Sequence, residues 1–322
     1  MTPLLLGILA VVLAGPVPSL LGRVDALASV PRAAVVLWQA VALAAVLAAV
    51  GSGLALALRL VTSGGRAGGL ALGPLRVGAH LVVLALTATV LARLTWVLIT
   101  NAHRLRSIRR RHRDLVDLAG AAARVTSAAV PPGVVRVLRH DAATAYCVPA
   151  LRHPRVVVSD AAIARLDRVE LDAVLAHENA HLHARHDLVI EAFTALWIAF
   201  PRVVRSRVAV ERIRALLEMA ADDEAVRIVG RVPMARALVT LATCSSAPSA
   251  PGQLLPPDGD DSAAYGTSQV LHQVERLAGR GGTRASRPML AAATYVAAAG
   301  VLVVPTVTVA MPWLRAAWRI VG

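Results

Sequence analysis

The segment LAHENAHLHARHD, residues 175–187, contains four of the ten histidines of the chain. Its first half holds the pattern H-E-x-x-H, formed by His177, Glu178 and His181. On an α-helix, side chains four residues apart lie about 40° apart around the axis and one turn apart along it. Both imidazoles can therefore bind one ion, while Glu178 can reach a water without ligating the ion itself. The spacing predicts a Zn²⁺ site with a catalytic general base beside it.

A catalytic zinc site needs a third protein ligand and one open position. The segment LLEMAADDEA, residues 216–225, supplies the better candidate, because Glu218 and Asp222 are four residues apart and share one face of a second expected helix. We expect Glu218 to ligate the metal. We expect Asp222 to accept a hydrogen bond from a ligand histidine, His177, and so to fix its tautomer.

Three further residues of the first motif compete for the metal: Asp187, His183 and His186. Asp187 would suit a chain that reverses after the second histidine, but Ala184 stands where such a reversal needs glycine. On a helix that simply continues, Asp187 lies about 120° around from His181 and roughly 9 Å along the axis. The two histidines also point away, so the sequence predicts exposed or supporting roles for His183 and His186.

The segments AVLAHENAHLHARHD and LLEMAADDEA together resemble the motif pair of the membrane-embedded gluzincin peptidases. The chain is most similar to the BlaR/MecR-type regulatory metalloproteases, in their actinobacterial form, and HtpX/Ste24-type proteases share the same pair. The segment TAYCVPALRHPRVVVSD also resembles the sheet edge and hairpin that precede the first motif in both groups. The resemblance covers essentially the whole chain, most strongly residues 134–226. It implies the same zinc ligands, general base and supporting aspartate.

Short runs of β-branched residues precede the first motif at 134–138, 143–148 and 155–159, separated by proline and glycine. They predict a small antiparallel sheet of about three strands. We expect a substrate to bind as an extended strand beside 143–148. The candidate substrate-binding residues are therefore Ala143, Thr144, Ala145 and Tyr146.

The helix that carries the first motif has a predicted start. Asp167 and Glu170 resemble a capping box that opens this helix. Cys147 is expected to be a small buried apolar residue, since two cysteines make no disulfide framework. The group that stabilises the oxyanion is left open, with Tyr265, His272 and several arginines as candidates.

The composition indicates a membrane protein, because 57% of the residues are hydrophobic and only 3% are aromatic. Four segments that are uncharged or nearly so are long enough to cross about 30 Å of hydrocarbon as helices. They lie at about 3–21, 34–58 and 78–100, with the fourth starting at residue 288. The sequence therefore predicts an α-helical integral membrane protein with four transmembrane helices.

Charge distribution divides the chain. The segment HRLRSIRRRHRD, residues 103–114, carries six arginines and one aspartate, which places it in the cytoplasm by the positive-inside rule. Nineteen of the twenty acidic residues lie within 102–287. We expect three spans in residues 1–101 and a cytoplasmic zinc metallopeptidase domain in 102–287, a mostly α, α+β zincin-like fold. Residues 288–322 would form the fourth span and a short amphipathic tail.

The sequence also excludes some chemistry. All 34 basic residues are arginine, so neither a Schiff-base lysine nor the Ser-x-x-Lys nucleophile of penicillin-binding proteins can form. We therefore expect no covalent sensing of a β-lactam by that chemistry. Direct nucleic-acid binding is not favoured, because the arginines are spread among acids or lie beside the spans, and only five Tyr and Phe residues are available for stacking.

These observations predict a zinc endopeptidase embedded in the cell membrane, with protein and the lipid bilayer as partners. The resemblance implies regulatory cleavage of a cytosolic BlaI-type, winged-helix repressor in antibiotic or cell-wall-stress signalling. One alternative is an HtpX/Ste24-like protease for quality control of membrane proteins. A second is a non-catalytic membrane receptor that keeps the zinc fold as a scaffold, against which the intact Glu178 argues.

Overall fold

The computed structural model describes residues 2–64, 74–122, 127, 129–131, 133–200, 207–244, 271, 273–278 and 287–321. Contacts between residues divide the chain into two compact units. The first unit comprises Met1–Ile99, Phe193–Ile213 and Arg287–Gly322, and the second comprises Thr100–Ala192 and Arg214–Ser286.

Two helices and a short 3₁₀ helix open the first unit. Helix α1 covers Thr2–Ala14 and α2 covers Pro16–Leu21. Because Pro16 has no N–H and its ring conflicts with a preceding helical turn, the chain breaks at Gly15 and restarts with proline in the first turn. The first apolar segment is thus two helices, where the sequence predicted one span. The 3₁₀ helix η1, Asp25–Ser29, then leads into α3, Pro31–Gly64.

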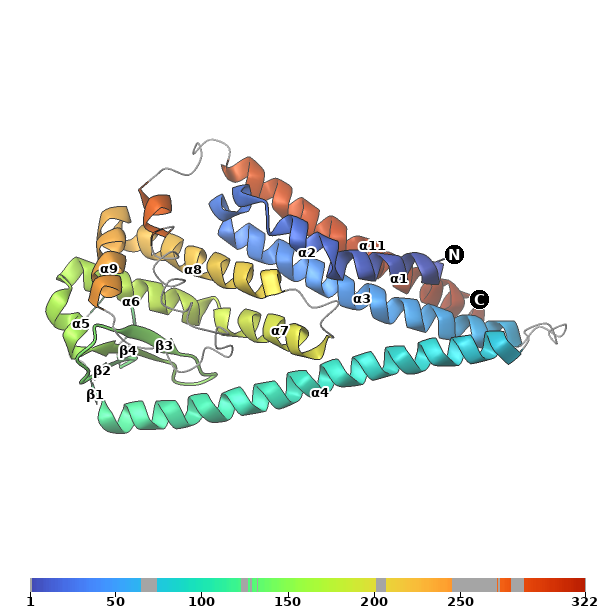
Figure 1. Ribbon diagram of the computed structural model, residues 1–322, viewed down its shortest axis with the longest axis horizontal. Coiled ribbons are helices and arrows are strands. Elements are labelled where there is room, and N and C mark those ends of the chain that lie inside the picture. Colours follow the sequence, from blue (N-terminus) through green and yellow to red (C-terminus); the bar gives the residue numbers. More distant parts are fainter. Residues whose placement is uncertain are drawn as a thin grey trace. The chain divides into compact units, whose positions relative to one another are not determined.

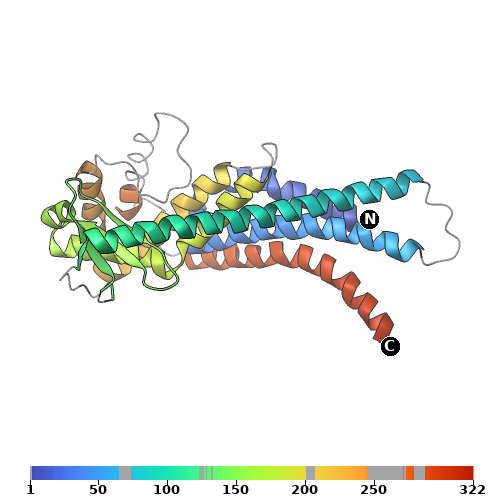
Figure 2. The ribbon, with the colours of Figure 1, turned by 90° about the horizontal axis from the view of Figure 1, so that it is seen from below.

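Helix α3 is the centre of the first unit. It packs along α1 and along α11, Arg287–Val321, as Figure 1 shows. It also approaches α4, Pro74–Ala119, so closely that a Cβ on Gly53 would overlap the side chain of Thr87. Glycine is therefore required at this crossing. Helix α11 runs without a break to its end and curves along its length (Figure 2).

Four helical stretches among the described residues are long and apolar enough to cross a membrane. They are Leu4–Leu21, Pro31–Leu56, Leu81–Ala119 and Arg287–Val307. The four apolar segments predicted from the sequence are thus helical. The third does not end near residue 100, since α4 continues through the arginine-rich segment as one helix.

The second unit contains a four-stranded sheet. Its strands are β1 (Ala121–Ala122), β2 (Val135–Leu138), β3 (Ala145–Val148) and β4 (Arg155–Ser159), in the order β1-β2-β4-β3. β4 is antiparallel to β3 but parallel to β2. The sheet is therefore mixed, and the prediction of an antiparallel sheet is wrong.

The apolarity of β4 explains this order. Val156, Val157 and Val158 are all at most 1% exposed, so both faces of β4 are covered. A strand buried on both faces belongs in the middle of a sheet. β4 folds back from β3 as a hairpin and inserts between β3 and β2, which makes its pairing with β2 parallel. β3 is left at the edge, paired with β4 alone among the described residues.

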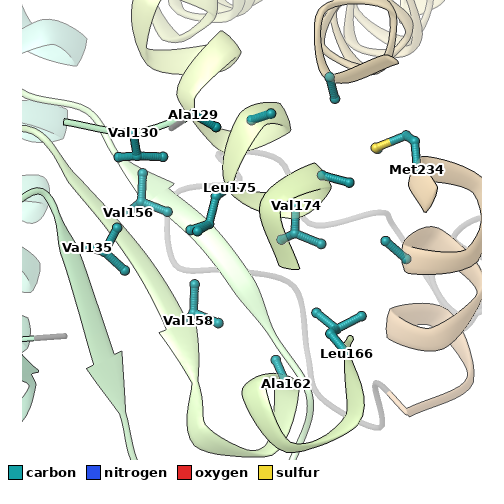
Figure 3. Packing of buried hydrophobic residues seen from close by; sticks show 14 of the residues in the cluster. Ala129, Val130, Val135, Val156, Val158, Ala162, Leu166, Val174, Leu175 and Met234 are labelled. Atoms are coloured by element: carbon teal, nitrogen blue, oxygen red, sulfur yellow. The ribbon is translucent and has the colours of Figure 1, made fainter. Parts of the chain in front are cut away.

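Helices cover the sheet and form the core with it. After α5, Asp160–Arg165, helix α6 runs from Arg168 to His183. Its N-terminus has the predicted capping box, in which Asp167 and Glu170 each accept from the other's backbone N–H. In Figure 3, Val156 and Val158 of β4 face Val174 and Leu175 of α6. Helix α9, Arg231–Cys244, adds Met234 to the same cluster.

The chain does not continue as one helix after the first motif. α6 ends at His183, and α7, His186–Ala199, begins after a two-residue turn. Arg185 has φ of 51° in this turn, which is uncommon for a residue with a side chain. Its guanidinium donates to the carbonyl of Ala150 at 3.0 Å and lies 3.5 Å from Asp187. These contacts stabilise a break that the sequence, without glycine here, did not predict.

Candidate metal centre

Three side chains that the sequence predicted as ligands lie together in the second unit: His177, His181 and Glu218. The Nε2 atoms of the two histidines are 3.2 Å apart, and Glu218 Oε2 lies 3.4 and 3.7 Å from them. A tetrahedral zinc ion with bonds of 2.0–2.1 Å separates its ligand atoms by about 3.3 Å. The three atoms therefore fit three corners of a zinc tetrahedron.

Two helices position these ligands. α6 places the histidines one turn apart, as the H-E-x-x-H spacing requires. α8, Arg207–Val229, brings Glu218 to them by burying the apolar residues Leu217, Ala221 and Ala225, and it ends where Gly230 takes a φ of 92°. The side chain of Glu218 is 34% exposed to solvent. The site is thus open to solvent on the side of this carboxylate.

Asp222 lies behind the first histidine. Its Oδ1 is 3.0 Å from Nδ1 of His177, and the carboxylate is fully buried. A carboxylate at this distance favours hydrogen on Nδ1 and leaves Nε2 free to ligate a metal. Arg276 lies 3.5 Å from the other oxygen of Asp222 and also bonds Asp223 at 2.7 Å and the Met219 carbonyl at 3.0 Å. Arg276 thereby balances the buried charge, a role that no pattern in the sequence signals.

His177 and Glu218 influence each other's ionisation. Burial acts to lower the pKa of His177, but hydrogen bonding to Asp222 and Glu218 outweighs it and raises this pKa well above its usual value. Burial likewise opposes ionisation of Glu218, yet His181 and His177 hold its pKa well below the usual value. The site therefore favours an ionised carboxylate and a readily protonated histidine, and a bound cation would replace that proton.

A model of Peptidase family M48 matches residues 102–273, more than half of the 322-residue chain. The chain belongs to Peptidase family M48. Membership supports a peptidase, hence a hydrolase, and M48 peptidases are typically metal-dependent, which agrees with the two-histidine, one-glutamate group. No curated protein and no solved structure matches the chain.

Beside the candidate metal centre of this M48 peptidase, two side chains lie close together in a way that the sequence did not predict. Glu178 is half-buried, and its carboxylate lies near the thiol of Cys147 on β3. Burial raises the pKa of the Cys147 thiol well above its usual value, and Glu178 raises it further. Cys147 is largely buried, as expected, but it also lines the space beside the expected general base. Side chains alternate along a strand, so Cys147 lies on the same face as Ala145. This alternation could have indicated that Cys147 lies beside Glu178.

The side chains of the four predicted substrate-binding residues point in different directions. Ala143 is buried in the core at 1% exposure, and Thr144 exchanges hydrogen bonds with Ser159 in both directions. The Tyr146 side chain points to the opposite face from α6, where its hydroxyl lies 2.9 Å from Nε2 of His112 on α4. Of the four, only Ala145 has its side chain on the α6 face within β3 itself.

The remaining candidate ligands lie elsewhere. Asp187 pairs with Arg109 of α4, as its neighbour Glu191 does, so it belongs to an ion-pair cluster and not to the group of three ligands. His183 is exposed and contacts Asn179 on its own helix. His186 instead is buried against His181, which the sequence placed out of reach. Tyr265 and His272, the candidates for oxyanion stabilisation, lie outside the described residues.

Proposed function

We propose that this M48 peptidase is a zinc-dependent endopeptidase of the cell membrane, with its peptidase domain, residues 102–287, in the cytoplasm. One observation carries the proposal: three ligand atoms at tetrahedral separations, with Glu178 next to a ligand on the same helix. The arginine-rich segment after the third apolar stretch supports the orientation.

The side chains of the site divide the work of peptide hydrolysis. Zinc, when bound, supplies Lewis acidity that polarises the scissile carbonyl and lowers the pKa of the attacking water. Glu178 accepts the proton of that water and passes it to the leaving amine. Asp222 keeps His177 in the tautomer that ligates through Nε2, 3.0 Å away. The exposed side of Glu218 is where the scissile bond would approach.

Among the described residues, β3 is paired on one side only, and its other edge is the proposed binding site for the substrate chain. Thr144 and Ser159 form a hydrogen-bonded pair, since Ser159 N donates to Thr144 O at 2.9 Å. Pairs alternate along an antiparallel ladder, so Tyr146 also bonds toward β4, whereas the backbone groups of Ala145 and Cys147 point outward. An extended substrate would pair with these two residues, whose side chains lie on the α6 face with the metal ligands.

For the substrate, we infer a cytosolic winged-helix repressor of the BlaI type, cleaved in antibiotic or cell-wall-stress signalling. The resemblance of both motifs and of the span layout to BlaR/MecR-type proteases supports this choice. A second candidate is HtpX/Ste24-like quality control of membrane proteins, which the shared motif pair favours. A non-catalytic receptor scaffold would not require Glu178 beside the ligands.

The test compares the proteomes of cells that express wild-type protein, Glu178→Gln or Glu224→Gln. Glu224 pairs with Arg227 on α8 and serves as a control for the loss of a carboxylate outside the centre. Glu178→Gln should keep its zinc, because Glu178 is no ligand, and lose cleavage by 10²-fold or more. Loss of one cleaved repressor supports regulation, and loss of many membrane-protein fragments supports quality control. Unchanged products in Glu178→Gln would refute peptidase activity at this centre.

A further inference from the structure

His186 begins α7 and lies directly against a candidate ligand. Its Nδ1 atom is 3.0 Å from Nδ1 of His181, and the two rings meet edge to face with centroids 4.7 Å apart. The residue is only 6% exposed. Nε2 of His181 faces the other two ligand atoms, so its Nδ1 is the nitrogen that faces away from the metal position.

The protons of this pair can be assigned by elimination. A histidine that ligates through Nε2 must carry its hydrogen on Nδ1. Nδ1 of His181 is therefore the donor, and Nδ1 of His186 must be the acceptor, with its own hydrogen on Nε2. His186 has to be neutral in this arrangement, because a doubly protonated ring offers no acceptor.

We infer that His186 is a positioning residue for the metal centre: it holds the ring and tautomer of His181 as Asp222 holds those of His177. The inference rests on the proposed function, since it presupposes a metal on His181. The inference also implies that Asp222 and His186 stabilise their ligand histidines to different degrees. Asp222 is a buried carboxylate, whereas His186 is a neutral acceptor, and bonds to charged groups are about twice as strong. His186 should therefore contribute less than Asp222.

The break between α6 and α7 brings His186 into contact with His181. On an unbroken helix His186 would point about 140° away from His181. The left-handed turn at Arg185 swings the start of α7 around so that the two rings meet. Contacts on both sides stabilise the turn: Arg185 with the carbonyl of Ala150, and Asp187 with Arg109 of α4 at 3.1 Å.

The experiment measures zinc affinity of the full-length protein in detergent by competition with a chelator, with unfolding temperature recorded beside it. His186→Ala should weaken zinc binding about tenfold, the lower end of the usual range for such supports. His186→Asn should restore affinity to within about threefold of wild type, because its amide oxygen can accept from Nδ1 of His181. His183→Ala is the matched control: it removes an exposed histidine of the same motif, and affinity should not change.

The outcomes separate this inference from the proposed function. If His186→Ala binds zinc as wild type does, or if His186→Asn is as weak as His186→Ala, His186 does not position the ligand and the inference fails while the zinc site stands. If the wild-type protein binds no zinc, or if His181→Ala does not weaken zinc binding, the proposed function is wrong, and the inference, which depends on it, is wrong as well. The bound Co²⁺ spectrum gives a second readout, since a reoriented His181 changes the ligand field in His186→Ala but not in His183→Ala.

Discussion

Replacing Asp222 by asparagine tests how the centre holds its first ligand. Asn keeps the size of the side chain and one oxygen that can accept from Nδ1 of His177, at the present 3.0 Å. It removes the charge. A hydrogen bond to a charged group contributes about 1.5–3 kcal/mol and a neutral one about 0.5–1.5 kcal/mol. The midpoints of these ranges differ by about 1.25 kcal/mol, which corresponds to somewhat less than tenfold in zinc affinity.

The loss of charge also reaches Arg276. Its guanidinium lies 3.5 Å from Asp222 but keeps its bond to Asp223 at 2.7 Å, so it is not left unpaired in the variant. Stability should therefore change little, and the effect on zinc should lie near the lower end of the 10–100-fold range known for such supporting groups. Asp223→Asn is the matched control, because it removes a neighbouring charge on the same arginine without touching His177.

The assay is competition for zinc between the purified variants and a chelator of known affinity. We expect Asp222→Asn to bind zinc 10–100-fold more weakly and Asp223→Asn to bind within about threefold of wild type. Equal loss in both variants would show that the general charge around Arg276 matters, and not the contact with His177. An Asp222→Asn protein with wild-type affinity would refute the assignment of Asp222 as a support of this ligand.

Three further predictions concern pH, substrate and orientation. The pKa of His177 is raised in the protein without metal, so protons compete with zinc for this ligand. Zinc affinity should therefore fall as pH decreases, and the fall should begin at a pH above the pKa of an ordinary histidine. An affinity that is constant down to pH 6 would contradict this. Ala145→Pro removes an outward N–H of the edge strand, so KM should rise without loss of thermal stability, whereas Tyr146→Pro removes a ladder bond and should lower the unfolding temperature. A reporter fused after Arg113 should read as cytoplasmic, and an external signal would exclude a cytosolic substrate.

The sequence was informative wherever a pattern is local. The capping box at Asp167, the histidine spacing on α6 and the pair of acids on α8 all depend on residues within one or two helical turns. Such short-range patterns determine which side chains share a face. The apolar segments were equally clear, since their helices need only length and composition.

Long-range contacts explain what the sequence did not predict. The turn at Arg185 depends on Ala150, 35 residues earlier, and on Asp187, which α4 contacts through Arg109. The parallel pairing of β2 with β4 depends on which strand is buried on both faces, and alternation within one strand cannot reveal its neighbours. Arg276 was missed for the same reason. A supporting role was one of the two predicted for His186, but its contact with His181 depends on the fold and was not predicted.

The hydrophobic core also decides where a substrate can bind. Val157 is buried on the face toward α4, and Val156 and Val158 are buried on the face toward α6, so β4 has no face left for solvent. It lies inside the sheet, and among the described residues β3 forms one edge, while the two-residue β1 forms the other. The hydrogen-bonded pairing of β3 with β4 then turns the backbone of Ala145 and Cys147 outward, while the thiol of Cys147 lies near Glu178. The burial of three valines thus leaves β3 at one edge of the sheet, with Cys147 beside the expected general base.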